Sequence, residues 1–175
     1  YGELPLPTRT GYTFDGWYDS TEYTTEITDT TVVVGTEDKI LYAKWVGNTY
    51  TVTFDADGGT VSPATKQVTF GQDYGELPVP TYTGHIFGGW FDENNNPIVA
   101  QSEVSIADDH TLTAVWTLEQ YLVSFTTDGN GTVDVSEVLV DYGTSYTISN
   151  NTITIDGTTV TATPSLGYVW DYWEP

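Results

Sequence analysis

The chain has 175 residues, of which 38% are hydrophobic and 14% aromatic, so it can bury a core and is not an ordinary disordered tail. Its 25 acidic and 4 basic residues give a net charge of −21, which repels nucleic acid and anionic lipid and argues against both as partners. The absence of cysteine excludes disulfides, thiolate catalysis and cysteine-based zinc sites. The sequence has no run of 18 apolar residues, so no membrane span is predicted. Because the sequence begins at Tyr1 without methionine or a signal peptide, we expect it to be an internal piece of a longer protein.

The first 17 residues contain two motifs that return later in the chain. Residues 1–8, Tyr-Gly-Glu-Leu-Pro-Leu-Pro-Thr, return as residues 74–81. Residues 10–17 form a frame of glycine, an aromatic residue or histidine, a second large aromatic residue and a final tryptophan, which returns at residues 83–90 and 166–173. Three copies of one frame in a chain with six tryptophans predict a tandem repeat.

The last motif of a repeat, Leu-Tyr-Ala-Lys-Trp at residues 41–45, returns as Leu-Thr-Ala-Val-Trp at residues 112–116. These recurrences predict three domains: a partial repeat at 1–47 that has only the C-terminal part, a complete repeat at 48–118, and a divergent repeat at 119–175 that is truncated at its C-terminal end.

The complete repeat is rich in threonine, valine and tyrosine, which favours β-structure. Strict alternation predicts a strand over residues 50–55, with Tyr50, Val52 and Phe54 on one face. Further strands are expected near residues 66–70, through the aromatic frame to Phe91, and over residues 111–116.

The divergent repeat opens with the same face, formed by Tyr121, Val123 and Phe125. It then inserts residues 152–163, two β-like runs around Asp156-Gly157. A two-residue Asp-Gly link between such runs predicts a hairpin.

Every tryptophan occupies a repeat position, so we predict that the tryptophans form the cores of the repeats and not a sugar-binding platform. The predicted structural core consists of Trp17, Trp45, Trp90, Trp116, Trp173, Phe14, Phe87 and Trp170. Possible contact residues on the surface are Tyr18, Tyr23 and Tyr82.

The metal candidate is calcium at Asp55 and Asp57, whose carboxylates alternate before two glycines, and the loop at residues 127–131 is an equally incomplete second candidate. A calcium loop of the EF-hand type needs further oxygen ligands that are missing here, so a hairpin turn is the preferred interpretation and no cofactor is expected. Catalysis is not expected either. His85 takes the place of a frame aromatic residue, His110 lies in an acidic turn that we expect to be a solvated loop, and small repeats offer no deep cleft for paired carboxylates.

Four motifs follow one another in the complete repeat: the opening Tyr-Thr-Val-Thr-Phe-Asp-Ala-Asp-Gly-Gly, the Gly-Glu-Leu-Pro-x-Pro-Thr segment, the frame and the closing Leu-x-Ala-x-Trp. In this order they resemble the B-repeat of internalin-type bacterial surface proteins, also called the Listeria–Bacteroides repeat. The resemblance covers nearly all of the first 117 residues, and the third copy is similar to a divergent member. It implies a mainly β protein of tandem small β-grasp, ubiquitin-like modules arranged as beads, without catalytic residues.

The resemblance also implies an extracellular, cell-surface location, with wall anchoring through a segment outside this chain. We expect a stalk or spacer that also serves as an adhesion module for a host or neighbouring-cell surface protein or glycan, or for other copies of itself. Two alternatives are a filament subunit assembled by pairing of strand edges and a glycan-binding module.

Overall fold

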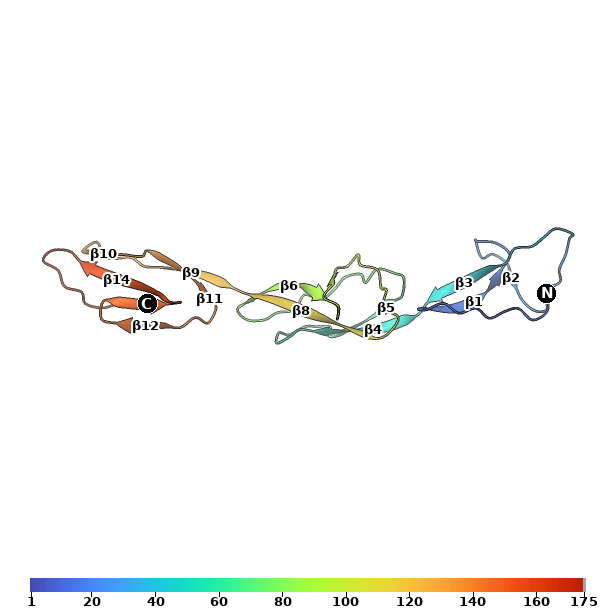
Figure 1. The fold of residues 1–175 in the computed structure, drawn as a ribbon, viewed down its shortest axis with the longest axis horizontal. Helices are drawn as coiled ribbons and strands as arrows, with labels where there is room; N and C mark the ends of the chain where they lie inside the picture. The colour runs from blue at the N-terminus through green and yellow to red at the C-terminus, as the bar shows by residue number, and fades with distance from the viewer. Residues whose placement is uncertain (175) are drawn as a thin grey trace. The chain divides into compact units, whose positions relative to one another are not determined.

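The computed structural model describes residues 1–174, and these residues form β-strands and no helix (Figure 1). The predicted mainly β class is confirmed. The chain divides into two compact units, residues 1–81 with 89–115 and residues 82–88 with 116–175. None of the described residues belongs to a helix that could cross a lipid bilayer.

The N-terminal part of the chain forms a three-stranded antiparallel sheet in the order β2-β1-β3. Its strands are β1 (Tyr12–Tyr18), β2 (Glu26–Ile27) and β3 (Tyr42–Gly47). A β-bulge interrupts β1 between Phe14 and Gly16. Ile27 is its only buried hydrophobic residue among those described, so this partial sheet has almost no core of its own.

The middle of the chain forms a five-stranded mixed sheet in the order β5-β4-β8-β6-β7. Its strands are β4 (Thr49–Asp55), β5 (Thr65–Thr69), β6 (His85–Phe91), β7 (Pro97–Ile98) and β8 (His110–Leu118). The predicted strands at 50–55, 66–70, 84–91 and 111–116 are thus confirmed to within two residues. β4, the first strand of the predicted repeat, lies parallel to β8, the last, with Val52 opposite His110 and Phe54 opposite Leu112.

The core of this sheet comes from the faces that alternation predicts. Val52 and Leu112 are fully buried, and Phe54 packs on Trp90 with ring centroids 5.0 Å apart. Full burial of one such side chain contributes about 1.5–3 kcal/mol, which is a large share of the stability of a small module.

The C-terminal part of the chain contains a two-stranded sheet, β11-β9, and a four-stranded sheet, β10-β14-β13-β12. Its strands are β9 (Gln120–Ser124), β10 (Gly131–Val133), β11 (Glu137–Asp141), β12 (Tyr146–Ser149), β13 (Thr152–Ile155) and β14 (Thr158–Pro164). The predicted hairpin is confirmed, since β13 and β14 pair around Asp156 and Gly157, both with positive φ.

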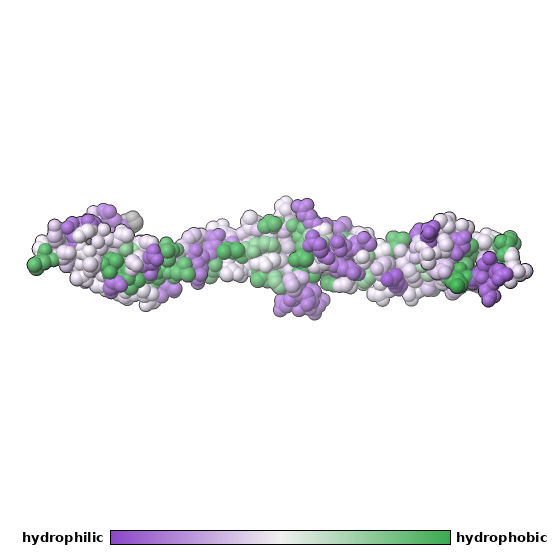
Figure 2. Space-filling model, turned by 90° about the horizontal axis from the view of Figure 1, so that it is seen from above, coloured by the Kyte–Doolittle hydropathy of each residue, from purple (hydrophilic) through white to green (hydrophobic). Residues whose placement is uncertain are grey.

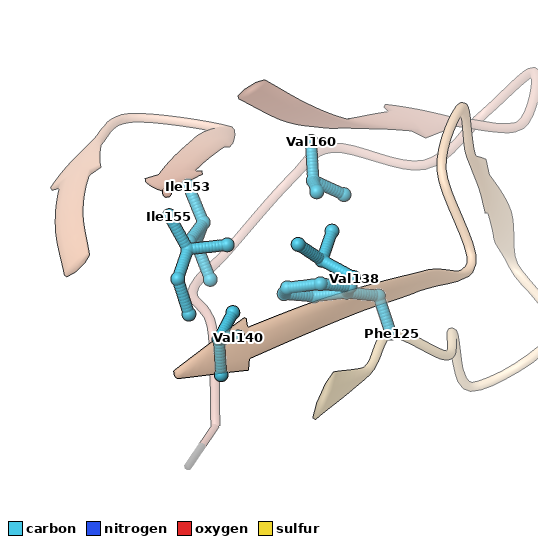
Figure 3. Close-up of a cluster of buried hydrophobic side chains, with 6 residues drawn as sticks. All are labelled: Phe125, Val138, Val140, Ile153, Ile155 and Val160. Atoms are coloured by element: carbon cyan, nitrogen blue, oxygen red, sulfur yellow. The ribbon is translucent and has the colours of Figure 1, made fainter. Parts of the chain in front are cut away.

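Six buried residues of this part of the chain form one cluster, in which side chains of β11 face those of β13 and β14 (Figure 3). They are Phe125, Val138, Val140, Ile153, Ile155 and Val160. The inserted hairpin therefore supplies half of this core.

A lysine fixes the proline-rich segment of the middle repeat. The ammonium group of Lys66 donates to the carbonyl oxygens of Tyr74 and Glu76, at 2.6 and 2.7 Å. Pro78 and Pro80 remove backbone donors from this segment, so it cannot be held by a regular ladder alone. No motif in the sequence indicates this role of Lys66.

We predict that Lys66→Met lowers the free energy of unfolding by about 1–3 kcal/mol, because two charge-assisted hydrogen bonds are lost. Urea denaturation followed by tryptophan fluorescence measures the effect. Lys39→Met, at an exposed loop position, is the control and should change the free energy of unfolding by less than about 0.5 kcal/mol. An equal effect of the two substitutions would contradict the role given to Lys66.

Candidate functional site

The frame glycine makes the same turn in all three copies. Gly11, Gly84 and Gly167 have φ values of 78°, 73° and 92°, which side chains rarely adopt. In each copy the following residue donates its N–H to the carbonyl oxygen three residues earlier, at 3.1, 3.1 and 3.0 Å. The frame is therefore a local structure that forms even in the divergent repeat.

The large aromatic residue of the frame packs on the closing tryptophan. Phe14 and Trp45 have ring centroids 5.5 Å apart, and so have Phe87 and Trp116. Trp170 occupies the same frame position in the third copy and is half-buried.

The final tryptophan of the frame has a repeated hydrogen bond. The indole Nε1 of Trp17 donates to the carbonyl oxygen of Pro5 at 2.8 Å, and that of Trp90 donates to Pro78 at 2.8 Å. The third copy lacks the Gly-Glu-Leu-Pro segment that supplies this acceptor. Accordingly, the buried Nε1 of Trp173 has no hydrogen-bond partner in the described part of the chain.

The structure places the predicted core residues at different depths. Trp90 is 2% exposed, whereas Trp17, Trp45, Trp116 and Trp173 are half-buried. Phe14, Phe87 and Trp170 are also half-buried.

A junction joins the first two repeats through a single linker residue, Asn48, which lies between β3 and β4. Its N–H donates to the carbonyl oxygen of Gly11 at 2.9 Å, and its own carbonyl accepts from Phe70 N–H at 2.9 Å. The Phe70 ring covers Gly11, where an added Cβ would lie 2.5 Å from it. The Tyr12 ring packs edge-on against Phe70, with centroids 5.1 Å apart, and its hydroxyl lies over Gly71.

The second junction has the same design. Glu119 is the single residue between β8 and β9, and its N–H donates to the carbonyl oxygen of Gly84 at 2.8 Å. Its carbonyl accepts from Tyr142 N–H at 2.8 Å, and the Tyr142 ring covers Gly84 so closely that a Cβ there would overlap it. The Tyr12 hydroxyl lies over Gly71, whereas no atom lies within 4 Å of a Cβ placed on Gly143.

The repeat boundaries at residues 47–48 and 118–119 were predicted from the sequence, but the contacts that form the junctions were not. A signal was available: Phe70-Gly71 and Tyr142-Gly143, 72 residues apart in the chain, each follow the strand that pairs with the opening strand of a repeat. The signal was overlooked because an aromatic residue and a glycine are common at the end of any strand.

The three candidate contact tyrosines lie at the surface in aromatic pairs. Tyr18 is half-buried and packs edge-on against Tyr23, which is 41% exposed, with ring centroids 5.5 Å apart. Tyr82 is 38% exposed and stacks on His85 at 3.9 Å. His85 thus takes part in an aromatic pair at the frame position.

The turn that carried the calcium candidate is closed by its own carboxylate. Asp55 Oδ1 accepts the N–H of Asp57 at 3.0 Å, and Asp57 has a φ of 43°. The described residues contain no group of three or more acidic or histidine side chains placed to hold a metal. A similar loop closure is found at Asp92, where hydrogen bonds from Asn96 hold the pKa of the carboxyl below its ordinary value.

The expectation of a solvated loop at His110 was wrong. His110 begins β8 and is half-buried, and its Nε2 lies 2.7 Å from the hydroxyl of buried Tyr74. Its Nδ1 donates to the carbonyl oxygen of Asp108, so in the neutral imidazole Nε2 accepts from the Tyr74 hydroxyl. Burial raises the pKa of the Tyr74 phenol. The pair is a structural contact inside the repeat.

Comparison with known proteins identifies these repeats. The sequence profile of the Listeria-Bacteroides repeat domain matches residues 1–44 and 50–115. The chain belongs to the Listeria-Bacteroides repeat family. The 60 residues after the second match lie outside it, which agrees with the divergence of the third copy.

Two relatives illustrate the context of these Listeria-Bacteroides repeats. The chain is 37% identical over 142 residues to a protein of Evansella cellulosilytica that is provisionally named as a membrane protein, covering 81% of the chain and 21% of that protein. It is 42% identical over 90 residues to internalin H of Listeria monocytogenes, covering 51% of the chain and 16% of internalin H. The chain thus spans about a fifth or less of these relatives. No solved structure matches it significantly.

We predict that Gly84→Ala weakens the second junction between Listeria-Bacteroides repeats. The methyl group must displace the Tyr142 ring, which costs about 1–3 kcal/mol in addition to the backbone strain. Gly143→Ala is the matched control, because its φ of 82° imposes similar strain while nothing lies within 4 Å.

Urea denaturation should show a larger loss of stability for Gly84→Ala than for Gly143→Ala, and hydrogen exchange at the Glu119 amide should accelerate in Gly84→Ala only. Equal losses and unchanged exchange would show that the ring over Gly84 contributes nothing to the junction.

Proposed function

We propose that this chain is an extracellular, cell-surface stalk or spacer that also serves as an adhesion module. The observation that carries the proposal is the one-residue linker at each junction, with both backbone groups hydrogen-bonded across the repeats. A linker without free backbone groups restricts rotation between successive repeats, whereas a flexible linker of many residues would allow it. Restricted rotation is what a spacer requires.

The family and the names of the relatives support a location at the cell envelope, with anchoring by a segment outside this chain. The net charge of −21 supports a hydrated surface, and Figure 2 shows hydrophilic residues interspersed with hydrophobic ones over the visible face. We propose domain boundaries after Gly47 and Leu118. We also propose that the repeats are of the β-grasp type, with the extended proline-rich segment in the place of the helix that usually crosses a β-grasp sheet.

No catalysis and no cofactor form part of the proposed function. The partner would be a surface protein or glycan of a host or neighbouring cell, or another copy of the chain. We propose Tyr18, Tyr23 and Tyr82 as contact residues, because they form aromatic pairs at the surface.

The spacer role predicts that the first two repeats tumble together. Phe70→Ala removes the ring that covers Gly11, and nitrogen-15 relaxation should then show a shorter rotational correlation time for residues 12–46 than for the middle repeat. In the unaltered chain the two correlation times should agree. Phe91→Ala, a half-buried phenylalanine of β6, is the control and should leave them equal. Different correlation times in the unaltered chain would refute restricted rotation.

The adhesive role predicts that beads coated with the chain attach to cultured mammalian cells better than albumin-coated beads. Tyr23→Ser and Tyr82→Ser together should lower attachment at least threefold, because they remove exposed aromatic area. Tyr146→Ser, at a 56% exposed position, should not change attachment. Attachment equal to that of albumin-coated beads would leave only the spacer role.

A further inference from the structure

The turn before β10 contains the only asparagine of the chain that is followed by glycine, at Asn130-Gly131. An asparagine can lose its side-chain amide when the backbone nitrogen of the next residue attacks its Cγ. Glycine favours this reaction, because no side chain shields the nitrogen or restricts the backbone. The fold requires glycine here, since a Cβ on Gly131 would lie 2.8 Å from the carbonyl oxygen of Thr163 on β14. Packing therefore fixes the reactive pair.

The backbone nitrogen of Gly131 lies on the open edge of a sheet. Gly131 begins β10, an edge strand in the order β10-β14-β13-β12. The carbonyl oxygen of Asn130 accepts the N–H of Ser165 at 2.8 Å. That of Gly131 instead accepts from the Thr127 hydroxyl within the loop, at 3.1 Å. Because backbone groups of successive residues alternate between the two sides of an antiparallel strand, the N–H of Gly131 points away from β14, and the ladder does not use it.

The side chain of Asn130 is held by Asp128. The N–H of Asn130 donates to Asp128 Oδ1 at 2.9 Å, and its Nδ2 donates to Oδ2 at 2.8 Å. The loop at Asp92 is closed in the same way by Asn96, at 2.8 and 3.0 Å. There, however, Pro97 follows, and its nitrogen has no hydrogen to give up. The two loops share a closure and differ in the nucleophile.

The turn lies at the surface in the complete repeat as well. Gly131 pairs with Pro164, three residues before a frame glycine. Thr60 of the middle repeat pairs with Thr81, which is also three residues before a frame glycine. Thr60 is exposed and Gly131 is half-buried. Water therefore reaches this turn in both repeats, so its exposure does not depend on how the repeat is closed.

We propose that Asn130 is a site of spontaneous modification, at which the side-chain amide is converted to a carboxylate with loss of ammonia. The Gly131 nitrogen gives its proton to a base from the solvent and forms a bond to Asn130 Cγ. The side-chain nitrogen takes up a proton and leaves as ammonia. One water molecule then opens the five-membered imide. Opening at the side-chain carbonyl gives aspartate, and opening at the main-chain carbonyl gives isoaspartate, in which the backbone runs through the former side chain.

Modification opens the loop at residues 127–131. The amide that donates to Asp128 is replaced by a second carboxylate, and two negative charges at this separation repel each other. In isoaspartate the backbone gains a methylene group, and the carbonyl that accepts the N–H of Ser165 becomes part of a free carboxylate. We therefore expect the start of β10 to separate from β14 as the protein ages, without the action of an enzyme.

The experiment incubates the full chain in mildly alkaline buffer at physiological temperature for several weeks. Mass spectrometry of chymotryptic peptides then locates each converted amide. Asn130 should be converted at least tenfold more than Asn96, which has the matched closure but is followed by proline. The Asp-Gly pairs of the chain do not interfere, because their isomerisation leaves the mass unchanged.

Two variants test the chemistry. Asn130→Gln should stay unmodified at this position, because its longer side chain would have to form a six-membered ring. Asp128→Ala should be converted faster than the unaltered chain, because the amide is released and the charge that opposes loss of the Gly131 proton is removed.

Hydrogen exchange measures the structural consequence. Exchange at the Ser165 amide should accelerate in the aged chain and stay at its starting rate in the aged Asn130→Gln variant. Equal conversion of Asn130 and Asn96 would overturn the assignment of the site. Unchanged exchange at Ser165 in a fully converted chain would overturn the opening of the loop.

Discussion

A glycine in the left-handed backbone region governs both the inside of each repeat and its connection to the next. At Gly11 and Gly84 the positive φ turns the chain into the frame strand and leaves the glycine carbonyl free to accept the N–H of the linker residue that follows the closing strand. The missing side chain lets an aromatic ring of the following repeat lie directly on the turn. One residue type thus satisfies a local and a long-range requirement, and no other amino acid meets both at low cost.

The parallel pairing of β4 with β8 gives the complete repeat a mechanical property that follows from its topology. β4 directly follows one linker residue and β8 directly precedes the other, so tension along the chain enters the repeat through these two neighbouring strands. Because the strands are parallel and adjacent, their hydrogen bonds are loaded together in shear instead of opening one after another. The proposed spacer role would benefit from this arrangement, because a linker of one residue at each junction leaves little chain to extend under tension.

Sequence reasoning predicted the strands of the middle repeat and the hairpin at Asp156-Gly157, because both depend on local signals, namely alternation and turn chemistry. It missed the short strands β2 and β7, since two residues are too few for any periodicity. The junctions, the role of Lys66 and the Tyr74–His110 contact depend on residues that are 8 to 59 positions apart, and only the fold brings them together. Of these, only the junctions leave a mark in the sequence, through the recurrence of Phe70-Gly71 as Tyr142-Gly143.

The three frame tryptophans show how strongly burial depends on the surrounding strands. The frame turn is the same in each copy, but only Trp90 is fully buried, because only the middle repeat has both an opening hairpin and a closing strand around it. Trp17 has the closing strand without the hairpin, and Trp173 has the hairpin without the closing strand. Each partial repeat therefore retains the hydrogen-bonded turn and loses part of the core. The turn is a property of the local sequence, whereas the depth of the tryptophan is a property of the completed sheet.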